Sequence, residues 1–284
     1  MKILILGCSG MLGNAMYRYL SLDKSLKVKG TIRSSLNIEY LDFNKTNDIL
    51  THVDVVNLDL LIKVFGQVKP DIVINCVGLI KQLAITKDPL QAVLINSLLP
   101  HRLAHLCSVS EARLIHISTD CVFSGKKGNY LETDFADADD LYGRTKLLGE
   151  VDYPHAITLR TSIIGHESNG NRSLINWFLA QKGSVKGFTQ AIFSGLPTIE
   201  LAKVVHQYIL PNPNLKGLYH LAVKPINKFD LLNWVKKIYN QNIEIIPCSD
   251  LVVDRSLDSH RFYKASGYNP PCWEHLIQNM HQFQ

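Results

Sequence analysis

The chain has 284 residues, of which 46% are hydrophobic and 19% charged, as in an ordinary globular protein with a substantial core. The net charge of +5 is small for this length, and the lysine pairs at 126–127 and 236–237 are isolated, which argues against nucleic-acid binding. Six scattered cysteines form no Cys-x-x-Cys pair, so a zinc site or a disulfide framework is not expected. No apolar run is long enough for a membrane span, and we expect a cytoplasmic protein without a membrane partner.

The first half of the chain alternates predicted strands and helices. Short runs rich in Val, Ile and Leu predict buried strands at 3–6, 28–32, 71–75, 114–118 and 156–160. Helical patterning between them covers 11–20, 58–66, 90–107 and 140–151, and Pro100 is expected to interrupt or kink its helix. This alternation predicts an α/β fold with a Rossmann-type, doubly wound parallel sheet.

The pattern changes after about residue 165. Helical stretches near 173–181, 197–210, 228–240 and 273–283 alternate with only short strand candidates. We therefore expect a nucleotide-binding Rossmann domain over 1–165 and a smaller α/β lobe, mainly for substrate binding, over 166–284. Residues from about 196 to 222 are a candidate for a second segment of the Rossmann domain.

A glycine motif, Gly7-Cys-Ser-Gly10-Met-Leu-Gly13, joins the first predicted strand to the first predicted helix. In this context the glycines allow a tight turn, a close approach of the backbone to a pyrophosphate, and close packing of helix on strand. The helix N-terminus directs free N–H groups and a positive dipole end toward the phosphates. The motif therefore predicts a dinucleotide site.

The end of the second predicted strand bears on the choice of dinucleotide. Arg33 and Ser34 stand where NAD-specific sites usually carry an acid, and an arginine suits the 2′-phosphate of NADP. We predict NADPH as the cofactor, with NADH as the alternative. In that alternative Arg33 is a surface cation and Asp42 binds the ribose.

The catalytic candidates are Tyr142 and Lys146, four residues apart on one predicted helix face, and Thr119 at the carboxyl end of a predicted strand. A lysine ammonium beside a tyrosine stabilises the phenolate and lowers its pKa. His101 and His105 share the same spacing but have no evident third ligand, so no metal site is expected.

Together these motifs resemble the extended short-chain dehydrogenases, and within them the dTDP-4-dehydrorhamnose reductase group. The resemblance rests on the glycine motif, Asn75-Cys-Val-Gly78, Ser118-Thr-Asp-x-Val-Phe-x-Gly and Tyr142-Gly-x-Thr-Lys-x-x-Gly-Glu150. Thinner likenesses follow at 159–165, 195–198 and 255–258. Cys121 departs from the pattern, since the group commonly has a tyrosine there, and we expect this difference to alter the wall of the sugar pocket.

The resemblance implies NADPH-dependent reduction of the 4-keto group of a nucleotide-linked 6-deoxyhexose, for surface polysaccharide synthesis. It implies catalytic roles for Thr119, Tyr142 and Lys146, with Tyr142 and Lys146 also at the cofactor. The other implied cofactor contacts are Gly7, Ser9, Gly10, Met11, Leu12, Arg33, Ser34, Asp54, Val55, Cys76, Val77 and Gly78. The implied contacts of the nucleotide-diphosphate sugar are Lys81, Thr119, Ser162 and Arg255.

Two other functions stay open on the same scaffold. An epimerase needs only the tyrosine, the lysine and a tightly held nicotinamide, whereas a 4,6-dehydratase would be expected to carry Glu after Asp120, where this chain has Cys121. Some relatives of the group are non-catalytic regulatory subunits. The sequence leaves the sugar, the nucleotide and the oligomeric state open, a homodimer included.

Overall fold

The computed structural model describes residues 1–35, 48–79, 88–168 and 170–284. The chain forms two compact units, and each is discontinuous in sequence. The first unit comprises Met1–Ser118, Asp139–Leu159 and Asn212–Leu218, and the second comprises Thr119–Ala138, Arg160–Pro211 and Tyr219–Gln284. The assignment of cofactor binding and substrate binding to separate domains stays a prediction.

The central sheet has seven strands in the order β11-β6-β5-β4-β1-β2-β3. Strand β1 pairs in parallel with β2 and β4, β5 pairs in parallel with β4 and β6, and β2 pairs in parallel with β3. The predicted Rossmann-type parallel sheet is therefore confirmed. Its strands are Lys2–Leu6 (β1), Lys27–Thr31 (β2), Ile49–Leu50 (β3), Ile72–Asn75 (β4), Arg113–Ile117 (β5), Ala156–Arg160 (β6) and Gly217–His220 (β11).

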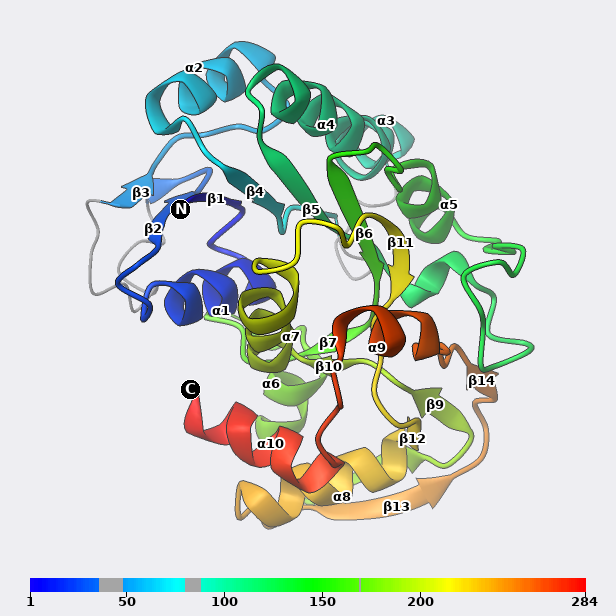
Figure 1. The fold of residues 1–284 in the computed structure, drawn as a ribbon. Coiled ribbons are helices and arrows are strands. Elements are labelled where there is room, and N and C mark those ends of the chain that lie inside the picture. The colour runs from blue at the N-terminus through cyan, green and yellow to red at the C-terminus, as the bar shows by residue number, and fades with distance from the viewer. Residues whose placement is uncertain (36–47, 80–87, 169) are drawn as a thin grey trace. The chain divides into compact units, whose positions relative to one another are not determined.

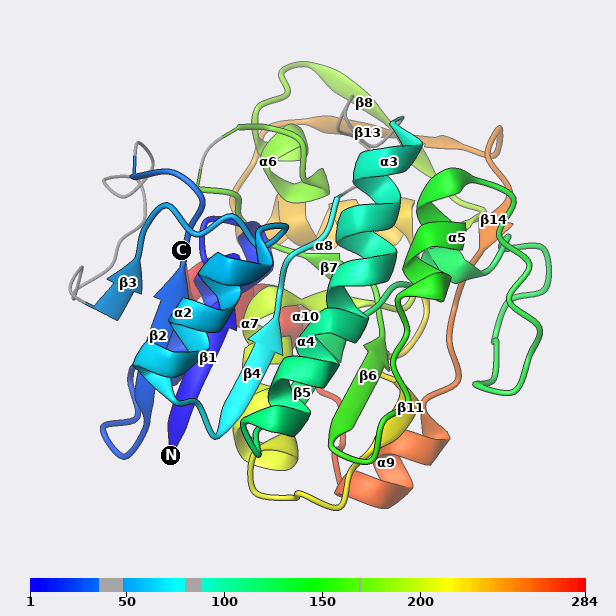
Figure 2. The ribbon, with the colours of Figure 1, turned by 90° about the horizontal axis from the view of Figure 1, so that it is seen from above.

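Helices of the first unit cover both faces of this sheet. Helix α1 (Met11–Leu20) lies on one face, and α2 (Leu58–Val68), α4 (Leu99–Val109) and α5 (Leu141–Leu148) lie on the other (Figure 1 and Figure 2). Leu4 and Leu114 from the sheet pack with Leu61 and Leu103 from the helices, and all four are fully buried. Each such side chain contributes about 1.5–3 kcal/mol when removed from water, so this layer fixes the sheet and its strand ends.

The predicted helix around Pro100 is confirmed, and its interruption takes the form of a π-helix. Helix α3 (Pro89–Ala92) continues as the π-helix η4 (Val93–Leu98) and then as α4. Proline has no N–H and crowds the carbonyl four residues before it, so Pro100 cannot bond the carbonyl of Asn96 in the usual way. The chain widens instead, and the Leu99 N–H donates to the carbonyl of Leu94, five residues back.

The second unit contains short strands and five α-helices among its described residues. The helices predicted after residue 165 are confirmed, as α6, α7 with its π-helical extension η6, α8 and α10. Helix α9 was not predicted, because only Phe262 in it is buried. The elements are η5 (Asp120–Val122), β7 (Ile163–Ile164), α6 (Leu174–Leu179), β8 (Ser184–Phe188), β9 (Ala191–Phe193), β10 (Leu196–Pro197), α7 (Thr198–Val204), η6 (Val205–Ile209), β12 (Ile226–Asn227), α8 (Lys228–Ile238), β13 (Glu244–Cys248), β14 (Val253–Asp254), α9 (His260–Ser266) and α10 (Trp273–Gln282).

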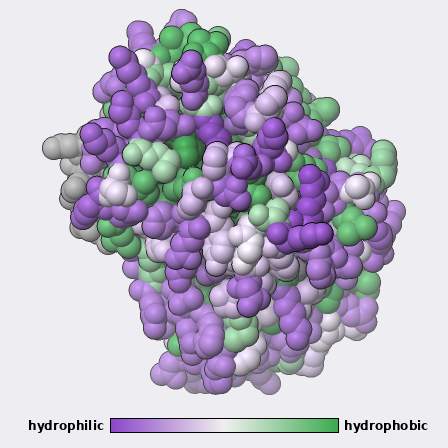
Figure 3. Space-filling model, in the orientation of Figure 1, coloured by the Kyte–Doolittle hydropathy of each residue, from purple (hydrophilic) through white to green (hydrophobic). Residues whose placement is uncertain are grey.

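The surface is mainly polar on the face drawn in Figure 3, where hydrophilic residues predominate and hydrophobic residues form scattered groups. Strongly exposed apolar side chains such as Val109, Phe135 and Val252 lie on different segments, as is normal for a protein surface. Within the described parts of the chain, no helix combines the length and the apolar character that crossing a bilayer requires.

Gly149 provides a test of how η4 and α5 pack. A Cβ added at Gly149 would lie 1.9 Å from the Asn96 carbonyl oxygen, whereas one added at the exposed Gly66 in α2 would meet nothing within 4 Å. We expect Gly149→Ala to lower the free energy of unfolding by at least about 2 kcal/mol, because backbone must move. Gly66→Ala should raise it by about 0.5–1 kcal/mol. Urea denaturation of both variants checks this, and equal effects would contradict the packing.

Candidate active site

The glycine turn after β1 is built for close backbone contact. Gly7 has φ +86°, a conformation that side chains disfavour, and its N–H donates to Thr31 Oγ1 at 3.4 Å. A Cβ at Gly13 would lie 2.2 Å from the Gly7 carbonyl oxygen, so helix α1 packs against the turn only because residue 13 is glycine. Gly10 is the N-cap of α1, and no side chain caps the helix there. The open N-terminus and the glycine cradle fit a dinucleotide pyrophosphate.

The residues predicted at the cofactor are placed on the first unit as follows. Ser9 and Gly10 are exposed, Met11 is half-buried and Leu12 is buried, all at the start of α1. Arg33 is exposed and Ser34 half-buried just beyond β2, while Asp54 and Val55 lie between β3 and α2, where Asp54 Oδ1 accepts from the Val56 N–H at 3.0 Å. Lys81 and Asp42 lie outside the described residues.

The turn after β4 is held by Asn75, which is buried at the strand end. Asn75 Oδ1 accepts from the Val77 N–H at 3.1 Å, so its amide nitrogen lies 3.1 Å from Nδ1 of the buried His116. His116 Nδ1 must then accept, which leaves the ring proton on Nε2. Burial lowers the pKa of His116, and the neutral ring it favours fits this arrangement. Together these bonds fix the turn that carries Cys76, Val77 and Gly78.

Lys146 lies buried at the end of β5. Its Nζ donates to the Ile117 carbonyl at 2.8 Å, and a Cβ added at Gly78 would lie 3.9 Å from the same Nζ. Burial lowers the pKa of Lys146 from 10.5 to about 8, and the nearby Glu150 opposes that shift. The Ser118 hydroxyl donates to Glu150 at 2.7 Å, so the carboxylate that sustains the lysine charge is itself fixed. The structure therefore brings the predicted Lys146 and Gly78 together at the carboxyl ends of β4 and β5.

Helix α5, which carries Tyr142 and Lys146, is held by polar contacts with η4. Ser97 donates to the Thr145 carbonyl at 2.8 Å, and the amide of Asn96 donates to Thr145 Oγ1 at 3.3 Å. Asn96 also accepts from the Leu79 N–H at 2.9 Å, which links the helix pair to the turn after β4. Tyr142 is half-buried on the first turn of α5. These contacts fix the position of the helix that carries Tyr142 and Lys146.

Thr119 directly follows Ser118 but belongs to the second unit. It is buried, and its hydroxyl accepts from the Cys121 N–H at 3.1 Å and donates to Asp120 at 3.2 Å. Burial raises the pKa of Asp120, against the lowering effect of Arg255. Burial, reinforced by the charge of Asp120, raises the pKa of the Cys121 thiol to about 12, so that thiol stays protonated and is no nucleophile.

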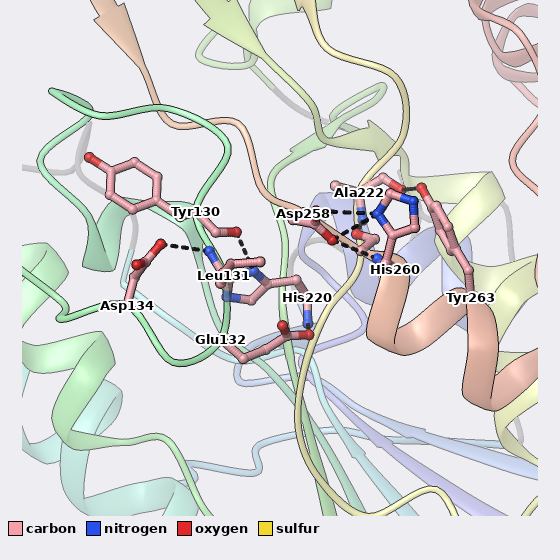
Figure 4. A network of polar contacts seen from close by, with 10 residues as sticks. Tyr130, Leu131, Glu132, Asp134, His220, Ala222, Asp258, His260 and Tyr263 are labelled. Atoms are coloured by element: carbon pink, nitrogen blue, oxygen red, sulfur yellow. Dashed lines mark hydrogen bonds and ion pairs between the residues drawn. The ribbon is translucent and has the colours of Figure 1, made fainter.

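The segment after Thr119 is anchored around His220, which is fully buried (Figure 4). Its Nδ1 lies 3.0 Å from the Tyr130 carbonyl, and its backbone N–H donates to Glu132 at 2.9 Å (Figure 4). The Tyr130 ring stacks on Phe123 with centroids 4.1 Å apart, and the Arg160 guanidinium lies 5.1 Å from the Phe123 centroid. This network fixes the course of the chain beyond Thr119.

Two predicted substrate residues, Arg255 and Ser162, also belong to the second unit. Arg255 Nε donates to the Phe123 carbonyl at 2.8 Å, so this side chain lies beside the Thr119–Phe123 segment. Ser162 is half-buried between β6 and β7, and its carbonyl accepts from the Leu196 N–H at 2.9 Å. A Cβ at Gly195 would lie 2.0 Å from that carbonyl oxygen, which explains the glycine there.

Sequence reasoning missed several residues that shape the site. Asn96 and Glu150 position α5 and Lys146, His116 holds Asn75, and Lys228 lies within electrostatic reach of Asp120. Glu150 stood in the quoted motif and could have been found four residues after Lys146, one helical turn on. Nothing local to the sequence marks the other three, since their roles depend on long-range contacts.

The parallel sheet, the glycine turn and the buried lysine at the strand ends are typical of dinucleotide-binding α/β proteins. The chain belongs to the family described by the RmlD substrate binding domain, whose model matches residues 1–277.

The chain is similar to reductases and to a subunit of another enzyme. The chain is 22% identical to the dTDP-4-dehydrorhamnose reductase of Aggregatibacter actinomycetemcomitans, over 99% of each chain. It is 28% identical to the methionine adenosyltransferase 2 subunit beta of Xenopus tropicalis, over 77% of this chain and 66% of that one. Its fold is similar to that of the dTDP-4-dehydrorhamnose reductase of Bacillus anthracis, solved in complex with NADP, with a TM-score of 0.80, 20% identity and coverage of 99% and 98%.

Proposed function

We propose that the protein is an NADPH-dependent reductase that acts on the 4-keto group of a nucleotide-linked 6-deoxyhexose. The observation that carries this proposal is the position of Lys146, buried at the end of β5 against the Ile117 carbonyl, on the same helix as Tyr142. A full-length relative that is a dTDP-4-dehydrorhamnose reductase supports the choice of substrate. Synthesis of a surface polysaccharide sugar is the proposed purpose.

In the proposed mechanism, the cofactor and the side chains of the protein supply different parts of the reaction. NADPH supplies the hydride when it is bound. Tyr142 donates a proton to the oxygen of the keto group, and Lys146 stabilises the resulting phenolate with its ammonium group. Thr119 orients the same oxygen with its hydroxyl. The chain thus orients the keto oxygen, donates a proton to it, and stabilises the charge that this leaves on the Tyr142 oxygen.

The proposed cofactor contacts lie along the first unit. The N–H groups at the start of α1 bind the pyrophosphate, and the glycine cradle of Gly7, Gly10 and Gly13 allows its approach. The exposed guanidinium of Arg33 binds the 2′-phosphate that distinguishes NADPH from NADH, with Ser34 beside it in the chain. Val77 and Gly78 line the nicotinamide end, next to Lys146.

A regulatory subunit is the second candidate function, because the relative from Xenopus tropicalis is the beta subunit of a methionine adenosyltransferase. In that role the protein would bind NADPH without oxidising it. The buried ammonium of Lys146 favours catalysis, since a purely structural position would not require a charge that burial destabilises. An epimerase on the same scaffold is distinguished by a lack of net NADPH consumption.

The reductase proposal predicts NADPH oxidation, followed by absorbance, when dTDP- or UDP-linked 4-keto-6-deoxyhexoses are supplied. Tyr142→Phe should lower kcat by about 10²–10⁴-fold, because the proton donor is removed, while the dissociation constant for NADPH changes little. Tight NADPH binding without oxidation of any of these sugars would contradict the reductase proposal and favour the regulatory subunit.

The cofactor proposal predicts that Arg33→Ala weakens the preference of the protein for NADPH over NADH. The variant should bind NADPH about 10- to 100-fold more weakly, since a charge-assisted contact to the 2′-phosphate is lost, and NADH binding should not change. Fluorescence titration with both cofactors measures this. Arg18→Ala, which removes an arginine from the last turn of α1, is the control. Equal weakening for NADPH and NADH would contradict the role of Arg33.

The pKa of Lys146 predicts the alkaline limit of activity. The free enzyme should lose kcat/KM about tenfold per pH unit above about 8, because Lys146 loses its proton there. Glu150 raises this pKa, so Glu150→Gln should move the fall to lower pH while its amide oxygen still accepts from Ser118. Initial rates from pH 6 to 10 are the measurement. If kcat/KM of Glu150→Gln fell at the same pH as that of the wild type, the proposed effect of Glu150 on the pKa of Lys146 would be contradicted.

A further inference from the structure

The turn after β4 lies between two parts of the proposed cofactor site within the first unit. A Cβ added at Gly7 would lie 2.9 Å from Val77 Cγ2, so the side chain of Val77 packs against the glycine turn that is proposed to bind the pyrophosphate. One residue further on, a Cβ added at Gly78 would lie 3.9 Å from Lys146 Nζ. The position of the turn after β4 therefore determines the space between the glycine turn and the lysine.

The sheet holds this turn through two side chains on neighbouring strands. Asn75 of β4 and His116 of β5 are paired in register, so their side chains lie next to each other on one face of the sheet. Asn75 Oδ1 accepts from the Val77 N–H at 3.1 Å, and the Asn75 amide nitrogen lies 3.1 Å from His116 Nδ1. The hydrogen bond that reaches the turn is thus supported from β5.

This support requires His116 to act as an acceptor. Because the amide oxygen of Asn75 accepts from Val77, its nitrogen donates, and His116 Nδ1 must receive that hydrogen bond. The ring is then neutral, with its proton on Nε2. The next residue, Ile117, provides the carbonyl that accepts from Lys146 Nζ at 2.8 Å. Two consecutive residues of β5 therefore hold the turn and the lysine.

The imidazole is a costly side chain for its position. His116 is fully buried, and among the described residues its Nε2 has no hydrogen-bond partner. A buried N–H without a partner destabilises the folded state, and an apolar side chain of similar size would avoid that cost. Within the same described parts of the chain, the hydrogen bond with Asn75 is the only one that the ring makes. The accepting nitrogen is therefore what a histidine provides here and an apolar residue does not.

We propose that His116 is a positioning residue for the nicotinamide half of NADPH. As the acceptor for Asn75, it holds the turn after β4 at the place where the nicotinamide and its ribose bind, beside Lys146. This inference rests on the proposed function. His116 makes no contact with the cofactor in this role, and binding of the 2′-phosphate at Arg33 does not depend on it.

Two variants of similar shape separate the acceptor from the ring. Leucine and asparagine have the same branching, but only asparagine places an acceptor oxygen near the position of Nδ1. His116→Leu should bind NADPH about tenfold more weakly than the wild type, because the turn loses its support, whereas His116→Asn should stay within about threefold. Both should bind 2′,5′-ADP, which contains the adenosine and the 2′-phosphate but no nicotinamide ribose, as the wild type does. Titration calorimetry measures these affinities.

His155→Leu is the matched control. His155 is a half-buried histidine of the same unit, and its Nε2 lies 2.8 Å from the Ala104 carbonyl. It directly precedes β6, at the amino end of that strand, whereas the turn held by His116 lies at the carboxyl ends of the strands. The variant therefore loses a comparable hydrogen bond away from the turn and should bind NADPH as the wild type does.

Several results would overturn the role of His116. Unchanged NADPH affinity in His116→Leu would do so. Equal weakening of NADPH and 2′,5′-ADP would show a general loss of structure instead, and equal weakening in His116→Leu and His116→Asn would assign the ring to packing. A wild-type protein that binds neither ligand would remove the cofactor proposal together with this one. If NADPH binding alone is weakened as expected but no 4-ketosugar is reduced, the role of His116 stands and the proposed reductase fails.

Discussion

The ammonium group of Lys146 is the feature on which the arrangement of the first unit depends. It is buried at the carboxyl end of β5, where a charge is costly. It donates a hydrogen bond to the Ile117 carbonyl, and the nearby Glu150 favours its charged form. Holding it there requires α5 to pack tightly on η4, which Gly149 permits, and requires a fixed turn after β4, which Asn75 provides. Such a costly charge at a strand end is typical of functional sites.

The start of the second unit is held by a different set of contacts. Thr119 and Asp120 are buried there, and the Thr119 hydroxyl accepts from the Cys121 N–H at 3.1 Å. Arg255 Nε donates to the Phe123 carbonyl at 2.8 Å, and the Tyr130 ring stacks on the Phe123 ring. Residues distant in sequence therefore fix the segment that follows Thr119.

The local patterns of the sequence predicted the parallel sheet and most helices, because buried parallel strands read as continuous apolar runs and the glycine motif has a strict local cause. The positions of Tyr142 and Lys146 on one helix followed from spacing alone. The π-helical form of η4, the Asn75–His116 contact and the contact of Arg255 with the Phe123 carbonyl could not be predicted. Each depends on residues far apart in sequence that only the folded chain brings together. For the same reason, the sequence does not show that residues 119–138 belong to the second unit and residues 212–218 to the first.

Transfer of deuterium from cofactor to sugar tests the central claim most directly. With NADPH deuterated at the transferred position of the nicotinamide and a nucleotide-linked 4-keto-6-deoxyhexose as substrate, mass spectrometry of the product reports where the hydride goes. The account predicts one deuterium atom bound to C4 of the product sugar, with one NADPH consumed for each sugar formed. A product without deuterium, or NADPH that binds and is never oxidised, would contradict a reductase and leave the buried Lys146 with another role.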